Sequence, residues 1–210
     1  MNGRADAREG DAPLKLGPLN AQTVHLCVDM QNMFAEETEW HTPWMRRVLP
    51  VVERIARQRP DRTVFTRFIP VARPEEAHGA WRRYYERWRS MTTERLDPRM
   101  IELVASLAEL VPPATVIDKR IYSPWLKTEL DAKLRQGGID SLIISGAETD
   151  VCVLATVLGA VDLGYRVILP MDALCSSSDQ THDALITLYR NRYGQQVETA
   201  SSEEILDCWQ

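Results

Sequence analysis

The chain has 210 residues, of which 44% are hydrophobic and 26% are charged, and its formal net charge is -5. This length suits one α/β domain with a sizeable core, and the composition is that of an ordinary globular protein. The acidic balance gives no general electrostatic reason for nucleic-acid binding, and no apolar run approaches the ~20 residues that span a bilayer. We therefore expect no nucleic-acid partner and no membrane partner.

Residues 1–20 are rich in Gly, Pro and charged side chains, and they precede the first apolar run. We expect a flexible N-terminal arm there and a single domain over residues 21–210. The N-terminal stretch lacks the apolar segment of a secretory signal, which favours a cytoplasmic location. The cysteines form no Cys-x-x-Cys pair, which argues against a disulfide framework and a zinc ribbon; they are Cys27, Cys152, Cys175 and Cys208.

Short apolar and β-branched runs alternate with helical periodicity along the chain. Strands are predicted at residues 23–30, 62–68, 115–118, 141–145, 165–169 and 196–199. Helices are predicted at residues 44–55, 74–89, 98–110, 126–136, 149–163 and 178–193. This alternation predicts a Rossmann-like α/β fold, with a six-stranded, mostly parallel sheet and helices on both faces.

Polar residues stand where several of these strands end. Asp29 ends the first strand, Arg67 lies at the end of the second, Lys119 follows the third, and residues 146–152 follow the fourth. Ligands of an open parallel sheet bind outside the carboxyl ends of its strands. We therefore expect these positions to meet at one edge of the sheet.

Cys152 is the strongest candidate for a nucleophile. The apolar strand before it breaks at Gly146, and a helix restarts near Thr149, so Cys152 lies in the first helical turn. A helix N-terminus is predicted to lower the pKa of this thiol and to hold a developing oxyanion. From this segment alone, a structural core cysteine is an equally good interpretation. Asp29 and Lys119 at the same predicted edge favour the catalytic one.

Three strings resemble the signature blocks of the isochorismatase-like cysteine hydrolases. They are VDMQNMF at residues 28–34, DKRIYSPW at residues 118–125 and GAETDVCV at residues 146–153. The similarity runs from about residue 23 to residue 199, with the blocks in the family's order and spacing. The resemblance implies the isochorismatase-like hydrolase fold, with six parallel strands.

The resemblance also implies the catalytic groups. It implies a triad of Asp29, Lys119 and Cys152, in which the carboxylate takes the thiol proton and the ammonium stabilises the thiolate. It further implies a cis peptide bond between Ala147 and Glu148, and an oxyanion hole formed by the backbone N–H groups of Glu148 and Cys152.

We therefore expect a hydrolase that cleaves a C–N bond of a small amide, carbamoyl or urea-like substrate through a thioester on Cys152. Arginine beside aromatic rings suits a planar substrate that bears a carboxylate or several carbonyls. The expected substrate-binding residues are Gln31, Phe34, Arg67, Tyr122 and Trp125. Two alternatives stay open: vinyl-ether hydrolysis as in isochorismatase itself, which needs no nucleophile, and a binding module that has kept the fold.

The chain departs from the family's pattern after the second strand. Metal-dependent members have an Asp-x-His motif there, whereas residues 66–81 read TRFIPVARPEEAHGAW, so we expect no metal and no cofactor. Met33 replaces the Asp that is usual in the first block. Residues 81–89 (WRRYYERWR) place four aromatic side chains on one helical face, which predicts either a core or interface stripe or a cap over the pocket. Family members are commonly oligomers, so we expect a homodimer or homotetramer.

Overall fold

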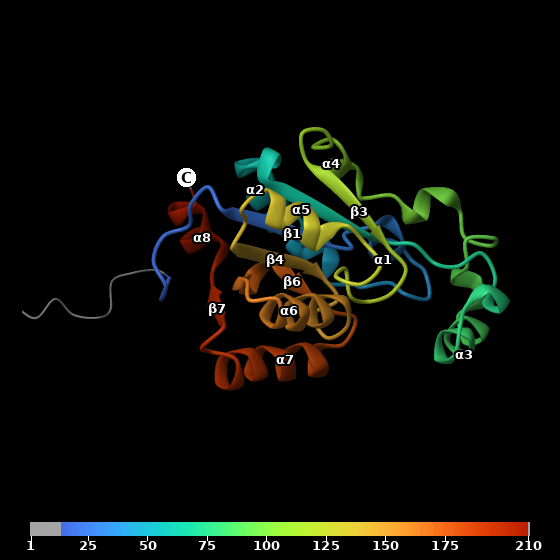
Figure 1. Cartoon of the computed structure of the whole chain (residues 1–210). Helices are drawn as coiled ribbons and strands as arrows, with labels where there is room; N and C mark the ends of the chain where they lie inside the picture. The colour runs from blue at the N-terminus through green and yellow to red at the C-terminus, as the bar shows by residue number, and fades with distance from the viewer. Residues whose placement is uncertain (1–13, 210) are drawn as a thin grey trace, which may run out of the picture.

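The computed structural model describes residues 14–209, and its centre is a single parallel sheet (Figure 1). The strand order is β3-β2-β1-β4-β5-β7, and the short strand β6 pairs with β4. The strands are β1 (Thr23–Val28), β2 (Thr63–Phe68), β3 (Thr115–Lys119), β4 (Ser141–Ala147), β5 (Arg166–Pro170), β6 (Leu174–Cys175) and β7 (Val197–Ala200). The predicted α/β fold is confirmed, with one two-residue strand more than expected.

Helices cover both faces of this sheet. One buried cluster packs α2 and α8 against Cys27, Ile143 and Ile168 on one face of the sheet. The other packs α5, α6 and α7 against the strand residues that point to the opposite face. In Figure 1, α3 lies apart from the sheet, at the right of the view. The helices are α1 (Asn32–Ala35), α2 (Met45–Gln58), α3 (Ala80–Arg87), α4 (Ala105–Ala108), α5 (Leu130–Gln136), α6 (Cys152–Asp162), α7 (Asp179–Arg192) and α8 (Ser202–Cys208). Among the described residues, no helix is both long and apolar enough to cross a bilayer.

The prediction of one helix at residues 98–110 is wrong for the middle of that range. A 3₁₀ turn over Pro98–Ile101 and the four-residue α4 replace it. The backbone between them is extended and bonds to the segment after β1: Asn32 N–H donates to Glu102 O over 3.0 Å, and Val104 N–H donates to Met30 O over 3.0 Å. These tertiary bonds take the place of helical ones.

Most of the expected N-terminal arm lies outside the described residues. Residues 14–20 were expected to belong to it, but they pack against the domain. Leu14 and Leu19 are 2% and 6% exposed, and Arg166 Nη2 donates to Gly17 O over 2.8 Å. These residues are therefore part of the packed domain.

The central strand β1 is buried along its whole length, as expected for a parallel strand covered on both faces. The imidazole of His25 lies inside it: His25 is 0% exposed, and its Nε2 lies 2.7 Å from Ser145 Oγ on β4. Burial lowers the pKa of His25 from its ordinary 6.5 to about 3. The folded protein therefore holds this ring in its neutral form.

Acid is expected to destabilise the protein through His25. The unfolded chain protonates this residue near pH 6.5 and the folded state only near pH 3, so stability is lost as the pH falls through that window. Between about pH 7.5 and about pH 5.5, the group should lower the free energy of unfolding by roughly 1 to 1.5 kcal/mol. Urea titrations of the parent and of His25→Gln measure this loss. An equal pH dependence in both proteins would contradict it.

Candidate active site

Asp29, Lys119 and Cys152 meet at the carboxyl edge of the central strands. Lys119 Nζ lies 2.6 Å from Asp29 Oδ2 and 3.4 Å from Cys152 Sγ. The three residues are 0%, 2% and 6% exposed. The structure therefore brings together three polar groups that are far apart in the sequence.

Each group is fixed by the end of a strand or the start of a helix. Asp29 directly follows β1 with a φ of 51°, in the left-handed region, and its Oδ1 accepts a hydrogen bond from Thr66 Oγ1 over 2.6 Å. Lys119 is the last residue of β3, and its backbone carbonyl accepts from Ile69 N–H over 2.8 Å. Cys152 is the first residue of α6, three residues later than the predicted helix start.

Burial and neighbouring charges set the protonation of the cluster. Burial lowers the pKa of Lys119, but its interactions with Asp29, and to a smaller extent with Cys152, outweigh burial and raise the pKa above its ordinary value. Lys119 is therefore an ammonium. Burial raises the pKa of the Cys152 thiol, and the ammonium opposes this only in part. The pKa of this thiol is therefore raised and not lowered as expected from its place at the helix N-terminus, because desolvation outweighs the favourable charge of Lys119.

The loop from β4 into α6 carries the nucleophile. Just before it, near the end of β4, Gly146 has a φ of 109°, and a Cβ there would lie 2.1 Å from Val28 O, so only glycine fits. The Ala147–Glu148 peptide bond is cis. Thr149 binds the loop to β6, because its N–H and its hydroxyl both donate to Cys175 O, over 2.9 and 3.1 Å. Within residues 14–209, the backbone N–H groups of Glu148 and Cys152 donate no hydrogen bond.

A cavity of about 270 Å³ reaches Cys152. Phe34 and Tyr122, two of the predicted substrate-binding residues, form part of its wall. The wall consists of Phe34, Glu39, Trp40, His41, Phe68, Tyr84, Trp88, Tyr122, Glu148, Val151, Cys152 and Ser177. A small substrate in this cavity would contact the thiol directly.

The other three predicted substrate-binding residues lie elsewhere. Gln31 is fully buried, and its amide bonds to the backbone of Phe68 and Ile101, so it fixes the strand ends instead of facing the cavity. Arg67 pairs with Asp118 and lines a separate surface hollow. Trp125 Nε1 donates to Thr156 O over 2.8 Å, and its ring stacks on Tyr165.

The sequence reasoning missed part of the cavity wall. Glu39, Trp40 and His41 come from the segment between α1 and α2, which carries no periodic signal. Tyr84 and Trp88 come from the predicted aromatic stripe of residues 81–89. The stripe is both a core element and a cap: Tyr85 is 1% exposed within the core, while its neighbours face the cavity.

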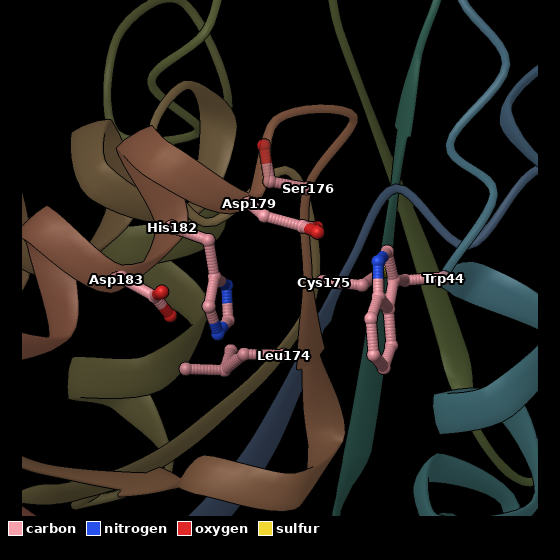
Figure 2. Close-up of a pocket in the computed structure, with 7 residues that line it drawn as sticks. All are labelled: Trp44, Leu174, Cys175, Ser176, Asp179, His182 and Asp183. Atoms are coloured by element: carbon pink, nitrogen blue, oxygen red, sulfur yellow. The ribbon is translucent and has the colours of Figure 1, made fainter.

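A second hollow, of about 310 Å³, is lined by Trp44 and by residues of β6, α7 and the segment between them (Figure 2). In Figure 2 the indole of Trp44 stands on one side and His182 and Asp183 of α7 on the other. His182 Nδ1 lies 2.8 Å from Thr149 Oγ1, which connects this hollow to the loop. None of the Asp29, Lys119 and Cys152 side chains lines it. In the described part of the chain, no three His, Cys, Asp or Glu side chains are grouped so that they could hold a metal ion.

The fold and the site together define a class: an α/β protein with a buried aspartate, lysine and cysteine at the carboxyl edge of a parallel sheet, the arrangement of a cysteine hydrolase. The sequence profile of the isochorismatase domain matches residues 23–201. The chain therefore belongs to the isochorismatase family.

Two relatives illustrate the similarity in sequence. The isochorismatase family protein YwoC of Bacillus subtilis is 34% identical over 112 residues, which cover 50% of this chain and 58% of YwoC. The Arabidopsis thaliana protein At3g16190, named a probable inactive nicotinamidase, is 28% identical over 178 residues, which cover 80% of this chain and 88% of that protein. The chain spans about half the length of the first curated relatives that it matches.

Two solved structures share the fold. A cysteine hydrolase from Pseudomonas syringae has a TM-score of 0.75 and 23% identity, with 90% of this chain and 93% of that one covered. An N-carbamoylsarcosine amidase from Thermoplasma acidophilum has a TM-score of 0.70 and 22% identity, with 86% and 96% covered. At such identities, the similarity is one of fold.

Proposed function

We propose that the protein is a hydrolase that cleaves a C–N bond of a small amide, carbamoyl or urea-like substrate through a thioester on Cys152. One observation carries the proposal: a single buried ammonium, Lys119 Nζ, contacts Asp29 Oδ2 at 2.6 Å and Cys152 Sγ at 3.4 Å beside a cavity that reaches the thiol. A nucleophile next to a base and a fixed positive charge is the arrangement that covalent catalysis needs.

The first half of the reaction forms the thioester. Because burial keeps the thiol protonated, Asp29 removes its proton as Sγ attacks the carbonyl carbon, and Lys119 stabilises the negative charge on sulfur. The carbonyl oxygen becomes an oxyanion, which accepts hydrogen bonds from the N–H groups of Glu148 and Cys152. The C–N bond then breaks, and Asp29 returns the proton to the leaving nitrogen.

The second half regenerates the enzyme. Asp29 removes a proton from a water molecule, whose oxygen attacks the thioester carbon. The C–S bond breaks, the acid or carbamate leaves, and the thiol recovers its proton from Asp29. The sum of both halves is one amide and one water giving one acid and one amine.

Two other functions fit the site less well. Vinyl-ether hydrolysis by the aspartate alone would leave the contact between Lys119 and Cys152 without a chemical role. A binding module on this fold would need neither Asp29 nor Lys119, yet both are buried in contact with each other. The similar proteins include one named a maleamate amidohydrolase, one named an N-carbamoylsarcosine amidase and one named a probable inactive nicotinamidase, so the site and not the family carries the proposal.

Ammonia release from a panel of small amides, ureas and N-carbamoyl acids tests the proposal. At least one compound should be hydrolysed. Acid quenching during its turnover should then trap an adduct on the peptide that contains Cys152, with the mass of the acyl group. Turnover of an amide without any adduct under single-turnover conditions, or activity confined to vinyl ethers, would overturn the proposal.

A further inference from the structure

The charged side chains on the cavity wall are of one sign. Glu39 and Glu148 line the cavity, and no Lys or Arg belongs to the described wall. Glu148 Oε1 accepts from Ser177 N–H over 2.9 Å, and among the described residues neither carboxylate pairs with a Lys or Arg. At the base, the charges of Lys119 and Asp29 offset each other through their 2.6 Å contact. The space that a substrate enters is therefore negative.

Aromatic rings on the cavity wall also favour a positively charged substrate. Six aromatic side chains line the cavity: Phe34, Trp40, Phe68, Tyr84, Trp88 and Tyr122. Phe34 and Trp40 stack with their ring centroids 6.3 Å apart and an angle of 15° between their planes. Aromatic faces carry a negative quadrupole, so they attract cations and planar rings and disfavour anions. A ring face that a substrate contacts therefore favours a cation over an anion, in the same sense as the two carboxylates.

The volume limits the size of the substrate. The cavity of about 270 Å³ lies just below the usual range of small-molecule sites, which begins at ~300 Å³. A single planar ring with an amide group fits such a space.

We propose that this cavity selects a small planar amide that carries a positive charge, and that it discriminates against amides that carry a carboxylate. The inference rests on the proposed function and adds the substrate class. The expectation of a planar substrate that bears a carboxylate or several carbonyls rested on arginine beside aromatic rings, with Arg67 as the candidate. That guanidinium lies outside the cavity and is paired with Asp118.

Arg87 lies near the cavity and makes the opposite outcome testable. The guanidinium carbon of Arg87, on α3, lies 5.0 Å from the ring centroid of Trp88. If Arg87 governed the local field, anionic amides would be preferred. Arg87 is not part of the wall, whereas Glu39 and Glu148 are, so we expect the two carboxylates to govern the field inside.

Three meta-substituted benzamides of similar size test the proposal: 3-(aminomethyl)benzamide, 3-(hydroxymethyl)benzamide and 3-carboxybenzamide. Their kcat/KM values from ammonia release should fall in the order cation, neutral, anion, with about tenfold or more between the first and the last. Raising the salt from about 0.05 to about 0.5 M should shrink this ratio, because the charges are partly exposed. Calorimetry on Cys152→Ala should give the same order of affinities without turnover.

Two matched variants test which side chain causes the preference for a cationic amide. Glu39→Gln should reduce the cation-to-anion ratio severalfold, and Arg87→Gln should not reduce it. Equal or better use of 3-carboxybenzamide by the parent protein would overturn this inference and leave the proposed function intact. Binding to Cys152→Ala in the predicted order, with no parent turnover of these or any other amide, would overturn the proposed function alone. Failure of all three compounds to bind would overturn the proposed substrate class.

Discussion

Cys152→Ala is expected to lower kcat/KM by about a thousandfold or more, because the variant has no atom that can form the acyl intermediate. The fold should persist. Lys119 Nζ keeps its bonds to Asp29 Oδ2 and to Ile121 O, at 2.6 and 3.3 Å, so no charge is left unpaired. Steady-state kinetics on the best amide of the panel and a urea titration measure the two quantities.

Cys175→Ala is the matched control for this variant. Cys175 is also a buried thiol, 1% exposed, and burial likewise raises its pKa. It lies on β6, and its carbonyl holds Thr149 in the segment that leads to Cys152, but it does not line the cavity that reaches Cys152. Its replacement should leave kcat/KM within about threefold. Activity retained in Cys152→Ala, or an equal loss in Cys175→Ala, would contradict the assigned nucleophile.

The sequence predicted the elements whose signal is local and regular. The runs TVHLCV and SLIIS are apolar because central parallel strands are covered on both faces, and they form β1 and most of β4. Asp29, Lys119 and Cys152 follow strand ends, and parallel strands present those ends at one edge. The positions of these residues at or after strand ends were therefore sufficient to predict that they meet.

Side-chain direction was not predicted in this way. Thr66 donates to Asp29, so the next residue of β2, Arg67, points to the opposite face, where it pairs with Asp118. Choosing Arg67 for its place at the strand end ignored this alternation. The walls from residues 39–41 and from α3 depend on long-range packing, as in the contact of Trp81 with Tyr122 at 4.8 Å between centroids. No local pattern carries that information.

Lys119→Met is expected to lower the free energy of unfolding by about 3 to 5 kcal/mol as well as to abolish turnover. The Asp29 carboxylate is 0% exposed and would lose its ammonium partner, although it would keep the 2.6 Å hydrogen bond from Thr66 Oγ1. Removing one member of a buried ion pair costs more than removing both, because a lone buried charge remains. Urea unfolding measures the loss of stability, and ammonia release measures the loss of activity.

The double variant Asp29→Asn/Lys119→Met separates structure from chemistry. It removes both buried charges, and the amide oxygen introduced at position 29 can still accept from Thr66, so most of the lost stability should return. Activity should stay absent, because an amide cannot take the thiol proton and no fixed charge stabilises the thiolate. If the pair were only structural, the stabilised double variant would recover turnover together with its fold. A stable double variant without turnover would place both groups in the reaction itself.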